Sequence, residues 1–221
     1  MTRLLLVRHG ESNSTVARVI GGPRTCTGLS PLGIVQSEML RDRWAADPRL
    51  AADLVLASNY PRAEQTAAIV VSATGAPAVK IDARFGEQDP GPRYDGMSFA
   101  EYAASYSAGV EAWESDDPFA ITFPGGETVA AFQYRVGLAI ADLLAEHRDA
   151  TVAIFCHGGV IDSIMRLALK SPPKGMFQLY AANASVTELE NVRSGLWRLM
   201  HYNDTSHLFG LPAAADAVLP D

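Results

Sequence analysis

The chain has 221 residues, of which 48% are hydrophobic, and it carries a formal net charge of −7 at neutral pH. That length and hydrophobic content are enough to bury a sizeable core, so a single α/β domain is expected. The acidic balance, with 25 acidic against 18 basic residues, argues against a nucleic-acid-binding protein, which usually carries a basic field.

Cysteine usage and hydropathy exclude further classes of protein. The two cysteines, Cys26 and Cys156, form neither a zinc-ligand nor a disulfide-rich pattern and favour a reducing compartment. The apolar run near the N-terminus is interrupted at Arg8, which makes it too short for a signal peptide. No stretch of the sequence reaches the length of a membrane-spanning helix. A soluble, cytoplasmic protein without a membrane partner is therefore expected.

The first predicted strand leads directly into polar residues. Leu4–Val7 is apolar at every position, which is typical of a central parallel strand covered on both faces. It runs into Arg8-His9-Gly10, and in open α/β sheets the ligand crevice lies beyond the carboxyl ends of such strands. Glu11–Leu29, rich in Gly, Ser, Thr and Pro, predicts a long loop with one short helical turn.

Helical and strand patterns alternate along the rest of the chain. Helices are expected at Ser30–Ala46, from about Arg62 to Ala73, from Ser98 to about Ser107, at Glu127–His147 and at Gly159–Leu169. Strands are expected at Asp53–Ala57, Ala78–Ile81, Thr151–Cys156, Ser185–Glu190 and Leu196–Tyr202. The last two strands alternate polar and apolar residues, which favours edge positions in the sheet. Segments 84–96 and 116–126 show no regular pattern.

This alternation of strands and helices predicts a three-layer α/β/α sandwich with a mostly parallel central sheet. Two helix starts carry a capping signal: Ser30 precedes Pro31, and Ser98 is followed three residues later by Glu101. Residues 1–210 are expected to form one domain, and residues 211–221 a loosely packed C-terminal tail.

Three predicted strand ends lead to residues suited to binding an anion. His9 and His157 each follow a strand and precede glycine, and Arg62 lies at the start of a helix after a third strand. Because parallel strands end at one edge of a sheet, these three side chains and Arg8 can meet in one cleft, where guanidinium groups match phosphate oxygens. Taken alone, His157 is more typical of a core histidine, and Arg62 of a surface ion pair with Glu64.

Taken together, these motifs resemble the histidine phosphatase superfamily, the phosphoglycerate-mutase-like group with an Arg-His-Gly signature. The resemblance covers nearly the whole chain and implies a phosphoglycerate-mutase-like fold. It rests on Arg8-His9-Gly10-Glu11-Ser12, Leu29-Ser30-x-x-Gly33-x-x-Gln36, Ser58-x-x-x-Arg62-Ala63-x-Gln65-Thr66-Ala67, Phe123-Pro124-Gly125-Gly126-Glu127-Thr128, His157-Gly158-Gly159 and Asn203-Asp204-x-x-His207-Leu208.

The resemblance implies a phosphohistidine mechanism. It implies that His9 is the nucleophile. It also implies that Arg8, Arg62 and His157 bind the phosphoryl oxygens. Further substrate-binding positions are Gly158 and Thr15, which stands where the family often has an asparagine six residues after the nucleophile. No metal or other cofactor is implied, because these side chains neutralise the phosphoryl charge.

The leaving oxygen needs a proton donor, which the family takes from an acidic residue in the loop after the third strand. Glu87 matches that position best, and Asp89 and Asp82 are the alternatives. The plainer interpretation is that one of these acids only forms an ion pair with Arg84 or Arg93. The Pro-rich stretch that follows, 89–96, departs from the family pattern and leaves the substrate open.

The sequence leaves three functions to weigh: a phosphatase, a phosphoglycerate-mutase-type phosphoryl transferase and a non-catalytic phosphate-binding module. Segment 96–125 contains neither Arg nor Lys to bind a second phosphate, which favours the phosphatase. A small phosphorylated substrate or phosphate is the expected partner, and a homodimer is a further possibility. Five aromatic residues form either an apolar lid or a helix core, and the core is favoured: Tyr94, Phe99, Tyr102, Tyr106 and Trp113.

Overall fold

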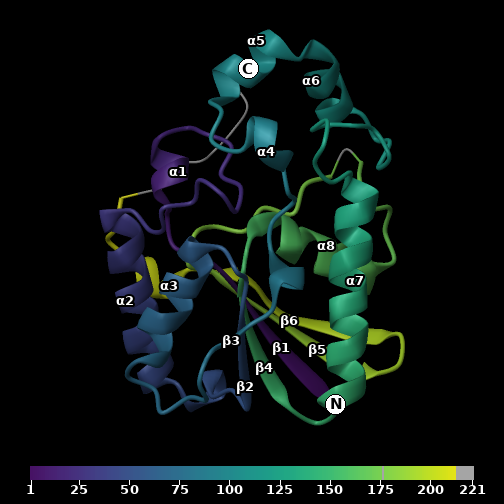
Figure 1. Ribbon diagram of the computed structural model, residues 1–221. Helices are drawn as coiled ribbons and strands as arrows, with labels where there is room; N and C mark the ends of the chain where they lie inside the picture. The colour runs from purple at the N-terminus through teal and green to yellow at the C-terminus, as the bar shows by residue number, and fades with distance from the viewer. Residues whose placement is uncertain (176, 213–221) are drawn as a thin grey trace.

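A six-stranded sheet with the strand order β3-β2-β4-β1-β5-β6 runs through the centre of the protein (Figure 1). It is seen in a computed structural model that describes residues 1–175 and 177–212. Four neighbouring strands are parallel: β3 (Lys80–Ile81), β2 (Leu54–Ala57), β4 (Thr151–Cys156) and β1 (Thr2–Arg8). The other two, β5 (Val186–Arg193) and β6 (Leu196–Asp204), are added antiparallel. The predicted α/β fold with a mostly parallel sheet is confirmed.

Helices cover both faces of the sheet because successive residues of β1 point to opposite sides. Leu4 and Leu6 pack against α7 and α8, whereas Leu5 and Val7 pack against α2 and α3, on the other face. Figure 1 shows these two helix pairs on either side of the strands. The helices are α2 (Pro31–Ala46), α3 (Pro61–Val71), α7 (Val129–Glu146) and α8 (Gly158–Leu169).

Side-chain caps start the helices where the sequence predicts them. The Ser30 hydroxyl accepts a hydrogen bond from the Gly33 N–H at 3.0 Å, at the start of α2. Ser98 and Glu101 form the expected capping box at the start of α5 (Phe99–Ser105). Each cap satisfies a backbone donor that the helix itself leaves without a partner.

A small helical region lies beyond the carboxyl ends of the parallel strands, at the top of Figure 1. It contains α4 (Gly91–Tyr94), α5 (Phe99–Ser105) and α6 (Ser107–Glu114), and the short α1 (Asn13–Val16) lies nearby. Tyr94 and Tyr102 are fully buried and pack with Phe123 and Ile20, so these tyrosines form a core, as favoured from the sequence. This region roofs the edge of the sheet where the candidate site residues lie.

Two expectations for the secondary structure were wrong. Segment 84–96 is not wholly irregular, because it contains α4. β5 is not an edge strand, since it pairs with β1 on one side and β6 on the other. One of its charged residues, the part-buried Glu188, accepts a hydrogen bond from Arg3 Nε at 2.6 Å.

Two further sequence expectations concern membranes and the chain end. Among the described residues, no helix combines the length and apolar character needed to cross a membrane. Most of the predicted tail, residues 213–221, lies outside the described residues. The domain boundary at residue 210 therefore stays a prediction.

The loop after β1 lies against α2 at a position where only glycine fits. A Cβ on Gly33 would lie 1.9 Å from the Glu11 carbonyl oxygen, which also accepts the Ser30 N–H. Because the colliding atom belongs to the backbone, Gly33→Ala should lower the free energy of unfolding by about 2 kcal/mol or more. Urea denaturation measures this change.

Gly137→Ala in α7 is the matched control. Its added methyl group would meet only Leu167, at an ordinary 3.6 Å. Replacing glycine within a helix should therefore leave stability unchanged or raise it by up to about 1 kcal/mol. Equal stability of the Gly33→Ala variant and the wild type would contradict the close packing of this loop on α2.

Candidate active site

The structure brings all seven predicted site residues to one edge of the sheet. Six of them line a cleft of about 710 Å³: Arg8, His9, Thr15, Arg62, Glu87 and Gly158. The seventh, His157, is fully buried beside it, and its ring centroid lies 5.1 Å from that of His9. Residues far apart in the sequence meet here because β1, β2 and β4 are parallel neighbours that end at the same edge.

The His9 imidazole is held in one tautomer. Its Nδ1 lies 2.6 Å from the Gly10 carbonyl oxygen, and its Nε2 lies 3.0 Å from Arg62 Nε. A carbonyl only accepts and a guanidinium only donates, so Nδ1 carries the proton and Nε2 presents its lone pair. Burial, and then the charges of Arg62 and Arg8, hold the pKa of His9 well below its usual value. The ring is therefore neutral and nucleophilic at Nε2.

Arg62 is buried in the first turn of α3 and faces the cleft. Besides its hydrogen bond to His9, its Nη1 donates to the Gly21 carbonyl at 2.9 Å, and its guanidinium lies 4.7 Å from the centre of the Tyr60 ring. Within the described residues it makes no ion pair with Glu64, which was the plainer interpretation of the sequence. A buried guanidinium directed at an imidazole is suited to holding an anion between them.

His157 occupies the end of β4 and leads into α8. Its Nε2 lies 2.8 Å from the Ser58 hydroxyl, while its buried Nδ1 has no hydrogen-bond partner among the described residues. Burial, and then the positive charge of Arg62, hold the pKa of His157 well below its usual value. A buried polar atom without a partner is rare in folded proteins and indicates a position where a ligand atom binds.

The remaining phosphate-binding candidates line the same cleft as His9. Arg8 Nη1 donates to the Ala181 carbonyl. Gly158 is the first residue of α8, and a Cβ there would lie 3.7 Å from Arg8 Nε. The buried Thr15 hydroxyl lies 2.9 Å from that of Ser12. The Arg8 guanidinium at the N-terminus of this 12-residue helix, together with Arg62 against His9, gives this end of the cleft a positive potential that favours an anion.

Of the three candidate acids, only Glu87 lines the cleft in the part of the chain that is described. Its Oε2 accepts the Gly159 N–H at 3.0 Å, and its Oε1 accepts the Gln88 N–H at 3.0 Å. Asp89 pairs instead with Arg24 at 3.1 Å, and Asp82 caps the turn Ala83–Phe85 and binds Arg84. The geometry favours Glu87 as the proton donor.

Several residues of the site were not predicted from the sequence. Asn183 Nδ2 donates to the His9 carbonyl at 3.0 Å, yet it precedes β5 as a lone amide among alanines. The far wall of the cleft includes Asp162, Arg166 and Lys174, which belong to α8 and the loop after it. Arg166 donates to Asp162 at 2.6 Å, and this spacing of four residues on a predicted helix was a signal for the pair.

A metal centre does not emerge from these side chains. Within residues 1–175 and 177–212, no group of three or more His, Cys, Asp and Glu side chains could hold a metal ion. Both cysteines are buried free thiols. Arginine and lysine side chains and the start of α8 line the cleft and give it positive charge.

Comparison with known proteins places the chain in a family. The family model described as the histidine phosphatase superfamily, branch 1, matches residues 4–205. The solved structure of YhfR from Bacillus stearothermophilus superposes with a TM-score of 0.83 at 26% sequence identity. That superposition covers 94% of this chain and 100% of the YhfR chain. The family predicted from the sequence motifs is confirmed.

Two curated relatives show similar sequences over most of the chain. The bifunctional protein Rv2228c of Mycobacterium tuberculosis is 30% identical over 207 residues, which cover 94% of this chain. The chain spans about half the length of that relative, 55%. The adenosylcobalamin/alpha-ribazole phosphatase of Escherichia coli is 29% identical over 179 residues, which cover 79% of this chain and 83% of the relative.

The two buried histidines of the site predict a pH dependence of stability. In the unfolded chain a histidine binds its proton below about pH 6.5. In the folded protein the lowered pKa values of His9 and His157 delay that uptake. The unfolded state therefore binds more protons at acidic pH. The free energy of unfolding should fall as the pH is lowered from 6.5 to 5, by up to about 1.4 kcal/mol per pH unit for each histidine.

Denaturant titrations at pH 7, 6 and 5 in a buffer free of phosphate measure this slope. His157→Asn removes one of the two histidines and should reduce the slope accordingly. A wild-type protein that is equally stable at pH 7 and pH 5 would contradict the neutral, buried state of both rings.

Proposed function

Because the chain belongs to the histidine phosphatase superfamily, we propose that it hydrolyses phosphomonoesters through a phosphohistidine formed on His9. The observation that carries this proposal is the unprotonated Nε2 of His9, which faces Arg62 inside a cleft that also contains Glu87. A nucleophile, an anion-binding group and an acid thus share one site, which is the set that phosphoryl transfer to a side chain requires.

In the first step, His9 Nε2 attacks the phosphorus atom of the ester in line with the leaving oxygen. A bond forms between Nε2 and phosphorus, and the bond from phosphorus to the leaving oxygen breaks. Arg62 turns its donors from Nε2 to the phosphoryl oxygens as the substrate binds, and Arg8 and His157 Nδ1 bind them as well. Glu87 gives its proton to the leaving oxygen, so the alcohol departs neutral.

In the second step, a water molecule attacks the phosphohistidine from the side that the alcohol has left. Glu87, now ionised, accepts a proton from this water. The bond between Nε2 and phosphorus breaks, which returns neutral His9 and releases inorganic phosphate. The hydrogen bond from His9 Nδ1 to the Gly10 carbonyl persists through both steps and stabilises the ring while it carries the phosphoryl group.

The walls of the cleft favour a hydrolase over a mutase. The roof contributes Phe99, Trp113 and Phe123, and segment 96–125 that contains them has no Arg or Lys. On the far wall, Arg166 is engaged by Asp162 and by two backbone carbonyls, and Lys174 donates to the Ala112 carbonyl. A second phosphate therefore has little counter-charge, whereas an apolar leaving group packs against the aromatic roof.

The substrate is accordingly proposed to be a small phosphomonoester with a partly apolar leaving group. The Escherichia coli relative, which is named for alpha-ribazole and adenosylcobalamin, supports a small phosphorylated molecule as the partner. A cytoplasmic location and a homodimer stay predictions from the sequence.

A panel of monoesters tests the proposed function. The protein should release inorganic phosphate from aryl and alkyl phosphates, with a higher kcat/KM for apolar leaving groups than for sugar phosphates. It should form no 2-phosphoglycerate from 3-phosphoglycerate in the presence of 2,3-bisphosphoglycerate. Excess EDTA should not change the rates, because the side chains of the cleft supply the positive charge.

His9→Ala is the control for this panel. It should abolish turnover and the acid-labile phosphoenzyme that rapid quenching traps in the wild type, while circular dichroism shows an intact fold. Isomerisation of phosphoglycerate without net phosphate release would overturn the hydrolase in favour of a mutase.

Glu87→Gln tests the acid separately. It should lower kcat/KM, which reports phosphoryl transfer to His9 and not the later hydrolysis, by roughly 100-fold or more for an alkyl phosphate, because the alkoxide needs a proton, and by less than about 10-fold for p-nitrophenyl phosphate. Asp89→Asn is the matched control, since Asp89 pairs with Arg24 outside the cleft and should keep the wild-type ratio of the two rates. An equal loss of kcat/KM for both esters in Glu87→Gln would assign Glu87 a structural role instead.

A further inference from the structure

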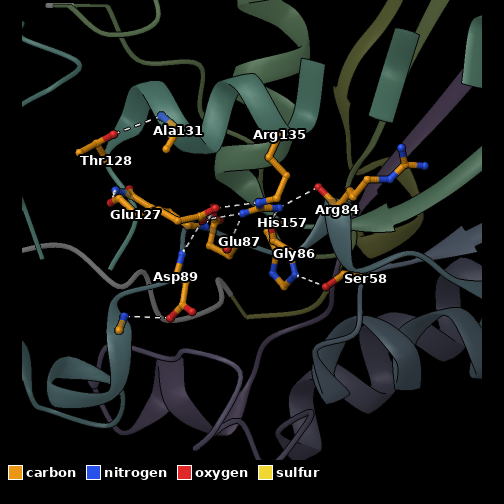
Figure 2. Close-up of polar contacts among 12 residues, drawn as sticks. Ser58, Arg84, Gly86, Glu87, Asp89, Glu127, Thr128, Ala131, Arg135 and His157 are labelled. Carbon is orange, nitrogen blue, oxygen red and sulfur yellow. Dashed lines mark hydrogen bonds and ion pairs between the residues drawn. The ribbon is translucent and has the colours of Figure 1, made fainter. Parts of the chain in front are cut away.

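We infer that Arg135 and Glu127 of the α7 region are positioning residues that hold Glu87 at the reacting ester. The inference rests on the proposed function, because it concerns the acid of that reaction. Figure 2 shows Arg135 between Glu127 and the backbone of the Glu87 segment. Neither residue lines the cleft in the described part of the chain, so both act through Glu87.

Arg135 binds the chain on the N-terminal side of the acid. Its Nη1 donates to the carbonyls of Arg84 at 2.8 Å and Gly86 at 3.1 Å, and its Nη2 donates to the carbonyl of Glu87 at 3.3 Å. One guanidinium thus binds three carbonyl oxygens of the four-residue segment 84–87. The Tyr60 hydroxyl donates to the Glu87 carbonyl as well, at 3.2 Å.

Glu127 binds the same segment on its C-terminal side. Its Oε2 accepts the Asp89 N–H at 2.9 Å, and its own N–H donates to the Asp89 carbonyl at 2.8 Å. The Gln88 side-chain amide donates to the Glu127 carbonyl at 2.7 Å. These contacts fix the two residues that follow the acid.

A bidentate ion pair joins the two halves of this arrangement. Arg135 Nε donates to Glu127 Oε1 at 2.8 Å and Nη2 donates to Oε2 at 2.6 Å. Both side chains are only about one-quarter exposed, 24% and 23%, so water competes weakly for the pair. The planar fork of arginine matches a carboxylate and several carbonyls at once, which lysine cannot do.

The position of the Glu87 carboxylate needs this restraint. Gly159 donates its N–H to Oε2, and a Cβ at Gly159 would lie 2.3 Å from Oε1, so the carboxylate fits closely against the start of α8. A displacement of about 1 Å of a reacting group can lower a rate by roughly 100-fold. Because Arg135 and Glu127 hold the chain on either side of Glu87, the displacement of its carboxylate stays small.

The test compares two esters in Arg135→Gln. The variant should lower kcat/KM for an alkyl phosphate by about 10- to 100-fold and change kcat/KM for p-nitrophenyl phosphate by less than about 3-fold, since this ratio excludes the later hydrolysis of phosphohistidine. KM for the alkyl phosphate should change little, because Arg135 does not contact the substrate. Arg135→Lys keeps the charge but not the fork and should not restore the alkyl phosphate rate.

Arg84→Gln is the matched control. Arg84 belongs to the same segment, but its side chain is 43% exposed and pairs with Asp82 and Asp142 instead of the acid. The ratio of the two rates should remain that of the wild type. Glu127→Gln provides a second variant from the other side of the ion pair and should change the ratio in the same direction as Arg135→Gln.

A double variant that combines Arg135→Gln with Glu87→Gln distinguishes a positioning role of Arg135 from a general effect on the stability of the protein. Once the acid is absent, adding Arg135→Gln should lower the alkyl phosphate rate no further. Equal losses for both esters in Arg135→Gln, or an additive loss in the double variant, would overturn the positioning role while leaving the phosphatase intact. A wild-type protein that cleaves neither ester would overturn the proposed function itself.

Discussion

The hydrogen bond from His9 Nδ1 to the Gly10 carbonyl is the interaction on which the site depends. It fixes the tautomer, and the tautomer decides which nitrogen can act as a nucleophile. The backbone around it is held equally firmly, since the His9 carbonyl accepts both the Ala184 N–H and the Asn183 amide. The residues just before β5 therefore hold the nucleophile on one side, while the last residue of β4, Cys156, accepts the His9 N–H on the other, so the backbone at the end of the sheet orients the imidazole.

Burial makes this orientation chemically useful. Both imidazoles of the site are removed from water and lie next to arginines, so they stay neutral where exposed histidines would start to take up protons. The guanidiniums keep their charge under the same conditions. The site thus combines an uncharged nucleophile with permanently charged guanidiniums. When a phosphate dianion binds, it neutralises the positive charge of these guanidiniums.

Local patterns explain what could be predicted from the sequence. Strand β1, the Ser30 and Ser98 caps and the ends of β2 and β4 follow from periodicity and neighbouring residues, and the family motifs indicated His9, Arg62, Glu87 and His157. Asn183 and Arg135 matter through contacts with distant segments, which no local pattern encodes. β5 resembled an edge strand because the partner of Glu188 is Arg3, at the opposite end of the chain.

The pairing of β1 with β4 has a consequence for how the protein folds. Arg3 lies opposite Thr151, so two segments separated by most of the chain must meet before His9 and His157 become neighbours. Such non-local parallel pairing forms slowly, because the intervening loop must be closed first. The anion-binding pocket is therefore a property of the completed sheet, because His9 and His157 become neighbours only when β1 and β4 pair.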